Sequence, residues 1–133
     1  MAKVFADSNV LLYTIGKDQA KKEIARRIVG AAPAISVQVL NEFINVAVKK
    51  LKLPMAIAAE TLMPLRFSCE VVQLTIDTHL RAIEIARANT IGIYDACIVA
   101  AAERASCDVL YTEDLSHGQK FGRVSIVNPF KAS

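Results

Sequence analysis

The segment KVFADSNVLLY, residues 3–13, indicates the fold class of this chain. Its first half is a short β-prone run that stops at Asp7, and its second half, from Ser8 to Tyr13, has the pattern of a short helix. Four further strand-like runs follow, at residues 33–37, 69–75, 108–112 and 124–127. Helical patterns separate all of them except the last two. Strands separated by helices predict an α/β protein with a parallel sheet, covered on both faces and joined by right-handed crossovers.

Two helices are expected between each of the first three strands and the next. Asp18 can cap a helix through Val29, with Gly30 closing it in the C′ position, and either Asp77 or Thr78 can cap another that ends near Asn89. The remaining predicted helices cover residues 37–51, 54–67 and 94–105. Residues 113–122 are polar and are expected to form a loop.

Length and composition favour a single domain over residues 1–133. Hydrophobic residues make up 53 % of the chain and charged residues 22 %, which excludes intrinsic disorder. Three cysteines without CxxC spacing and two distant histidines exclude a structural zinc site. No apolar run reaches the roughly 18 residues of a membrane span. The N-terminal stretch from Met1 to Asp7 meets a charge too early for a signal peptide, so we predict a cytoplasmic protein that contacts no membrane.

Four acidic residues stand where a parallel sheet binds its ligands, beyond the carboxyl ends of the strands. Asp7 directly follows the first strand, and Asp114 lies two residues beyond the fourth. Glu42 lies in the second turn of the helix after the second strand, and Asp95 lies at the start of the last helix. The four acids, from four separate segments, are therefore predicted to converge at one end of the sheet.

Two of these acids stand in apolar surroundings. Asp95 is the only charged residue between Ile91 and Ala102, and no Lys or Arg lies within four residues of Asp95 or Glu42. Buried carboxylates are seldom left unpaired because desolvation costs several kcal/mol. A bound cation is one way to compensate them. Taken singly, each acid also has an ordinary structural alternative: a helix N-cap for Asp95, an exposed helix position for Glu42, and turns for Asp7 and Asp114.

Hard oxygen ligands without histidine or thiolate suit Mg²⁺ or Mn²⁺. The chain as a whole is mildly basic, with 16 Lys and Arg against 13 Asp and Glu. Its basic residues gather at 21–27 and 49–52, and such stretches can track a phosphate backbone, although they can also be ordinary solvated helix faces.

Four motifs in this order resemble those of the PIN-domain ribonucleases, in particular the VapC-type toxins of toxin–antitoxin pairs. They are VFADSN at 4–9, VLNEF at 39–43, IYDACIVAAA at 93–102 and LYTED at 110–114. The resemblance covers nearly the whole chain. It implies a three-layer α/β/α fold around a five-stranded parallel sheet of order 3-2-1-4-5. It also implies a Mg²⁺- or Mn²⁺-dependent endoribonuclease that forms a homodimer, cuts RNA, and is covered at its acidic groove by an antitoxin peptide.

The resemblance also implies roles for individual residues. The acidic quartet is carried over as Asp7, Glu42, Asp95 and Asp114, with Asp7 and Asp95 binding the metal directly and Asp114 through water or at a second ion. Asn9 and Thr112 match supporting polar positions. One departure is Ser116, which stands where many members of the family have a further acid, and this puts a second metal ion in doubt. His117 is expected at the surface.

Two alternatives remain open at this stage. A PIN-like scaffold without catalysis would bind RNA or protein only. A receiver-type signalling module would need paired acids after the first strand and a Lys after the fifth, whereas only Asp7 follows the first strand and Lys131 comes late. The apolar stretch 51–67 has too many large side chains for one helix face, so it is either core or an association surface.

Overall fold

A computed structural model describes residues 2–131. Met1 and residues 132–133, which the predicted single domain includes, lie outside the described residues. The elements follow in the order β1 (Val4–Ala6), α1 (Ser8–Tyr13), α2 (Gln19–Gly30), β2 (Ala34–Ser36), α3 (Val37–Lys49), α4 (Met55–Ser68), β3 (Glu70–Val72), α5 (Ile76–Asn89), α6 (Ile93–Arg104), β4 (Val109–Tyr111), β5 (Lys120–Phe121) and β6 (Val124–Val127).

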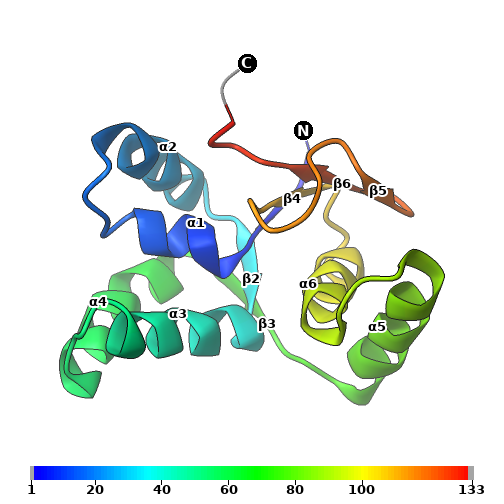
Figure 1. Cartoon of the computed structure of the whole chain (residues 1–133), viewed down its shortest axis with the longest axis horizontal. Coiled ribbons are helices and arrows are strands. Elements are labelled where there is room, and N and C mark those ends of the chain that lie inside the picture. Colours follow the sequence, from blue (N-terminus) through cyan, green and yellow to red (C-terminus); the bar gives the residue numbers. More distant parts are fainter. Residues whose placement is uncertain (1, 132–133) are drawn as a thin grey trace.

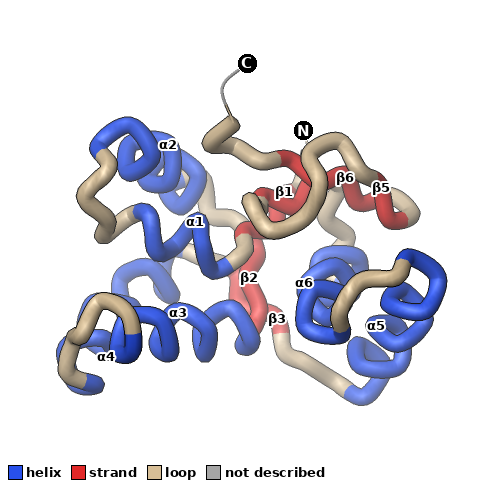
Figure 2. The backbone as a smooth tube through the Cα atoms, viewed as in Figure 1, coloured by secondary structure: helices blue, strands red, loops and turns tan. Residues whose placement is uncertain are grey.

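The sheet has the order β3-β2-β1-β4-β6-β5, and every pairing is parallel except that of β5 with β6. Its five parallel strands therefore have the predicted order 3-2-1-4-5. Helices α1 to α4 lie on one side of the sheet and α5 and α6 on the other (Figures 1 and 2). The predicted three-layer α/β/α arrangement is thus confirmed.

The prediction of a loop over residues 113–122 was wrong at its end. Lys120 and Phe121 form β5, which pairs antiparallel with Ser125 and Val124. Gly122, with φ of +61°, begins the two-residue turn that joins β5 to β6, and this left-handed conformation favours glycine. Phe121 is almost fully buried, so the hydrophobic effect fixes this short edge strand.

Two predicted helix ends also differ from the structure. Gly30 is the last residue of α2, and the left-handed position beyond it is Ala32, with φ of +57°. Helix α5 is capped by Thr75, whose hydroxyl accepts from the Thr78 backbone N–H while the Thr78 hydroxyl accepts from the Thr75 backbone N–H. This reciprocal capping box satisfies two free backbone donors at once, which explains why it starts the helix earlier than a cap at Thr78 would.

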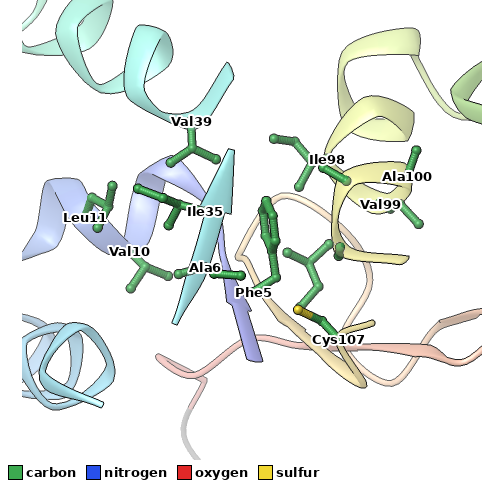
Figure 3. Close-up of a cluster of buried hydrophobic side chains, with 14 of the residues drawn as sticks. Phe5, Ala6, Val10, Leu11, Ile35, Val39, Ile98, Val99, Ala100 and Cys107 are labelled. Atoms are coloured by element: carbon green, nitrogen blue, oxygen red, sulfur yellow. The ribbon is translucent and has the colours of Figure 1, made fainter. Parts of the chain in front are cut away.

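The core lies on both faces of the sheet. Phe5 reaches from β1 toward Ile98 on α6, whereas Ile35 on β2 points to the opposite side, toward Leu11 on α1 (Figure 3). Phe5, Leu11 and Ile35 are completely buried, and burying such a side chain contributes about 1.5–3 kcal/mol. Helix α6 is buried over six of its 12 residues, which accounts for its almost uninterrupted apolar sequence.

Helix α4, in the stretch 51–67, is partly core and partly exposed. Ala58 and Leu62 are buried, but Met55 and Phe67 are 60 % and 75 % exposed. Pro64 lies inside the helix and does not end it. Within residues 2–131, no helix is by itself long and apolar enough to span a membrane; α5 and α6 meet the criterion only as a pair bent by 118°.

Candidate active site

Asp7 is the most buried of the four predicted acids. It follows β1 directly, caps α1, and is only 4 % exposed. Its Oδ1 accepts from the Ser8 backbone N–H at 2.7 Å, and its Oδ2 accepts from the Thr112 hydroxyl at 2.8 Å. Burial nevertheless raises the pKa of Asp7 from 3.8 to about 7, and the charges of Glu42 and Asp114 act in the same direction. The carboxyl group is therefore placed where ionisation is costly.

Thr112 and Asn9 join Asp7 to Asp114. The Thr112 hydroxyl gives its one proton to Asp7 and accepts from the Asp114 backbone N–H at 3.1 Å. The Asn9 amide nitrogen donates to Thr112 Oγ1 at 3.2 Å and to Asp114 Oδ2 at 3.3 Å. These acceptors fix the orientation of the Asn9 amide. Its oxygen, Oδ1, is buried and has no hydrogen-bond partner among the described residues.

Glu42 is held by neutral donors. The Ser8 hydroxyl donates to Glu42 Oε1 at 3.2 Å, and the Gln38 amide donates to Oε2 at 3.3 Å. The Ser8 backbone N–H also donates to Asp7, so this one residue contacts two acids of the predicted quartet. Glu42 is partly buried, and these two hydrogen bonds supply part of the compensation that its own segment of the sequence lacks.

Asp95 stands in the first turn of α6, and Gly92 is the N-cap. The alternative that Asp95 is itself the N-cap was therefore wrong. Burial raises the pKa of Asp95, and the charge of Asp114 adds to this effect. The partial positive charge of the helix N-terminus acts in the opposite sense, because it favours a carboxylate in the first turn.

The four acids influence one another electrostatically, but they do not form a closed cluster. Asp7 is affected by Glu42 and Asp114, and Asp95 by Asp114. Over residues 2–131, no three acidic, histidine or cysteine side chains meet closely enough to hold a metal ion as they stand. None of the four carboxylates forms an ion pair with a described basic residue.

The donor set nevertheless fits a hard divalent cation. Every candidate ligand atom is an oxygen, and these are the atoms that Mg²⁺ and Mn²⁺ prefer. Asn9 Oδ1 is a further oxygen, buried beside Thr112 and Asp114 and left without a donor. Because Mg²⁺ is usually held by one or two carboxylates and several waters, a fully closed cage of protein ligands is not required.

Sequence reasoning missed some residues of this region. Gln38 stands four residues before Glu42, a spacing that places both on one side of a helix, and this was the available signal. Glu113 accepts from the Tyr13 hydroxyl at 2.8 Å, and Lys21 donates to that hydroxyl at 3.2 Å. The segment that bears Asp114 is thereby tied to α1 and α2. His117 is exposed, as expected.

Several solved structures are similar to this chain. A toxin–antitoxin complex from Klebsiella pneumoniae has a chain that is 21 % identical, with a TM-score of 0.72, and the match covers 98 % of this chain and 100 % of that one. VapBC-1 from nontypeable Haemophilus influenzae is 19 % identical, with a TM-score of 0.71 and coverage of 96 % and 98 %.

VapC20 from Mycobacterium tuberculosis, a toxin that cleaves the sarcin–ricin loop, is 20 % identical, with a TM-score of 0.67 and coverage of 84 % and 90 %. At these identities the likeness concerns the fold. No curated protein matches this chain. The family model of the PIN domain matches residues 4–121, which include all four acids, and the chain therefore belongs to the PIN domain family.

Proposed function

We propose that this protein is a Mg²⁺- or Mn²⁺-dependent endoribonuclease. The observation that carries the proposal is the buried Asp7, whose hydrogen-bond network extends through Thr112 to Asp114 at the carboxyl edge of the sheet. A buried carboxylate with a strongly raised pKa at a cleft-forming edge favours a functional site. Membership of the PIN family and the RNA-cleaving activity stated for VapC20 support RNA as the substrate class.

In this proposal the metal is held directly by Asp7 and Asp95, and by Asp114 through water or at a second ion. Asn9 Oδ1 is the remaining oxygen that can face a cation or its water shell. When bound, such an ion lowers the pKa of a coordinated water and neutralises negative charge on the scissile phosphate. Thr112 and Asn9 keep the Asp7 and Asp114 carboxylates in place through their hydrogen bonds.

Glu42 has the role of orienting the attacking water and taking its proton. Ser8 and Gln38 each bind one oxygen of its carboxylate, so the group has a fixed direction and keeps free lone pairs for a water molecule. The water oxygen forms a bond to phosphorus while the bond from phosphorus to the 3′-oxygen breaks. The leaving oxygen takes a proton from solvent, which gives a 3′-hydroxyl and a 5′-phosphate.

We further propose that the protein is the toxin of a toxin–antitoxin pair, that it acts in the cytoplasm and that it forms a homodimer. The support is the likeness of its fold to VapBC chains from several bacteria. The cognate antitoxin would cover the acidic groove with a basic side chain. We also propose that residues 1–133 form one domain, because a single sheet joins the first strand to the last.

A non-catalytic scaffold that only binds RNA or protein is the second candidate. It is favoured by one observation, namely that no three of the described acids stand close enough to hold a metal ion without rearrangement. The two candidate functions differ in one observable: only the nuclease cleaves RNA when a divalent ion is present.

The test is incubation of total cellular RNA with purified protein in Mg²⁺, in Mn²⁺ and in EDTA. The proposal predicts cleavage in either metal and none in EDTA, with 5′-phosphate and 3′-hydroxyl ends on the fragments. Cleavage that persists in EDTA, or fragments that end in a cyclic phosphate, would contradict it. Intact RNA in all three conditions would favour the scaffold.

A further inference from the structure

A groove of about 680 Å³ opens beside the candidate active site. It is lined by residues of α3, of the start of α6 and of the segment that leads from β3 into α5, and in Figure 1 that segment is flanked by α3 and α6. Its size is within the roughly 300–1,000 Å³ typical of small-molecule sites. Glu42 contributes to its lining, so the groove reaches one of the four candidate carboxylates.

One wall of the groove is an amide-rich stripe of α3. Gln38, Asn41 and Asn45 recur at the spacing of one helix face, together with Glu42. Within residues 2–131 the Asn41 and Asn45 side chains make no hydrogen bond, so each offers a free carbonyl oxygen and a free NH₂ group. Gln38, by contrast, donates to the Tyr94 carbonyl at 3.1 Å and thereby holds α3 against the start of α6.

The opposite side is apolar and aromatic. Tyr94 is 73 % exposed, and Leu74 and Ile93 are also exposed in the same groove. No Lys or Arg lines it, and His79 is the one basic side chain in the lining, so the groove offers little positive charge to a phosphate group. An uncharged planar ligand with hydrogen-bonding edges matches this lining, because it can stack on the aromatic ring while the amides bind its edge.

We propose that this groove binds one unpaired RNA base beside the phosphate that is cleaved and so selects the nucleotide at the cut. The inference rests on the proposed ribonuclease function and adds to it the residues that give sequence preference. Unpaired bases are recognised in this way, by stacking on aromatic rings and by hydrogen bonds to their edges. An RNA strand whose phosphate lies at the carboxylates reaches the groove at Glu42, and this continuity favours RNA over a peptide as the occupant.

The experiment uses a pool of short unstructured RNAs of random sequence, with sequencing of the cleavage sites. The variants are Tyr94→Ala, Tyr94→Phe and Asn45→Ala. Matched controls are Phe67→Ala, an aromatic residue of almost equal exposure on α4, and Gln19→Ala, an exposed amide on α2. All four substituted residues are exposed, so the fold should persist in the five variants, and circular dichroism verifies it.

The wild type is expected to prefer one nucleotide at a position next to the cut. Tyr94→Ala and Asn45→Ala should lose that preference and raise KM about tenfold, the lower part of the range for loss of one stacked base, while Tyr94→Phe and both controls keep it. The same substitutions are also made in an Asp95→Asn background, so that binding can be measured without cleavage. Fluorescence anisotropy of the fluorescein-labelled pool should then show weaker RNA binding for Tyr94→Ala and Asn45→Ala than for Tyr94→Phe and the two controls.

Two outcomes overturn the inference, and they are distinguishable. Unchanged preference and KM in Tyr94→Ala and Asn45→Ala, with normal cleavage, would show that no base occupies the groove while the ribonuclease function stands; a protein partner would then be the occupant to consider. A wild type that neither cleaves nor binds the pool in Mg²⁺ would overturn both proposals together.

Discussion

At the scale of a single residue, the buried Asp7 carboxylate of the candidate site lowers the stability of the folded protein. Its carboxyl group is almost fully buried, and its pKa is raised to about 7. Between the unfolded value of 3.8 and about 7, the folded protein therefore binds more protons at this position than the unfolded chain. The free energy of unfolding must then fall as pH rises through this interval, because ionising the buried carboxyl group costs more in the folded protein than in the unfolded chain.

Replacing Asp7 with Asn is expected to stabilise the metal-free protein at pH 8 and to have little effect at pH 4. The difference in the free energy of unfolding at pH 8 can reach about 4 kcal/mol, at 1.36 kcal/mol per pH unit between 3.8 and about 7. Urea denaturation of both proteins in EDTA at the two pH values measures it. A wild type as stable as the Asp7→Asn variant at pH 8 would count against the raised pKa.

Individual site residues were predictable to different degrees. The positions of Asp7 and Asp114 follow from the rule that ligands bind beyond the ends of parallel strands, which needs only strand assignments. Ser8 and Gln38 were missed because their importance lies in contacts with Glu42, and the contact from Ser8 joins residues 34 positions apart. The sequence also did not predict that Asn41 and Asn45 line a groove, because the groove forms only where α3 packs beside α6.

At the scale of elements, the segment between β4 and β5 carries Asp114 and is tied by hydrogen bonds to α1 at its start and to β6 at its end. The Tyr13 hydroxyl on α1 donates to Glu113, next to Asp114. The Tyr13 ring also lies against Phe130, with 4.5 Å between the ring centroids, and beneath the Lys21 ammonium group at 4.8 Å. The Tyr13 hydroxyl, through its hydrogen bond to Glu113, links the Tyr13–Phe130 contact to the segment that bears Asp114.

The variant Tyr13→Phe keeps the ring and removes this connection. We expect the Asp114 backbone N–H, which donates to Thr112, to exchange with solvent several-fold faster, while the midpoint of global unfolding changes little. A net loss of about 1 kcal/mol or less is appropriate for a largely exposed hydrogen bond. Hydrogen exchange followed by mass spectrometry or NMR provides the measurement. An unchanged exchange rate at Asp114 would contradict the idea that the Tyr13 hydroxyl holds this segment in place.

Most elements were predicted well, down to three-residue strands and the Asp18 cap of α2, whereas strand β5 and the N-cap of α5 were not. Helix α6 was evident from its apolar run, and the parallel strands from their alternation with helices. Strand β5 has two residues, too few for any periodic pattern. The capping box at α5 depends on which of several polar residues, among them Thr75, Asp77 and Thr78, adopts extended backbone, and composition alone does not decide this.

At the scale of the whole molecule, the candidate site is an acidic patch on a mildly basic protein. The chain has 16 basic and 13 acidic residues, and none of the four candidate carboxylates forms an ion pair with a described basic residue. The metal-free fold therefore keeps like charges near one another, as the mutual effects of Asp7, Asp95 and Asp114 indicate. The proposed function predicts that a divalent ion bound at these carboxylates would relieve that repulsion.

Thermal melting should consequently show a crossover between the wild type and Asp95→Asn. In EDTA at pH 8 the variant is expected to melt at the higher temperature, because it lacks one of the repelling charges. In Mg²⁺ at 100 times the Kd, the free energy of unfolding of the wild type should rise by about 2.7 kcal/mol. That of the variant should rise far less. Melting curves in which Mg²⁺ shifts both proteins equally would indicate that the ion binds elsewhere.

The most direct test of the central claim is the rate of RNA cleavage by Asp95→Asn beside that of Asp77→Asn. Both residues are aspartates in the first turn of a helix, at α6 and α5, but Asp77 lies outside the candidate site and is largely exposed. We predict that Asp95→Asn lowers the single-turnover rate in Mg²⁺ by at least about a hundredfold, which corresponds to about 2.7 kcal/mol, while Asp77→Asn cleaves at the wild-type rate. Equal rates in the two variants would contradict the assignment of these carboxylates as the active site.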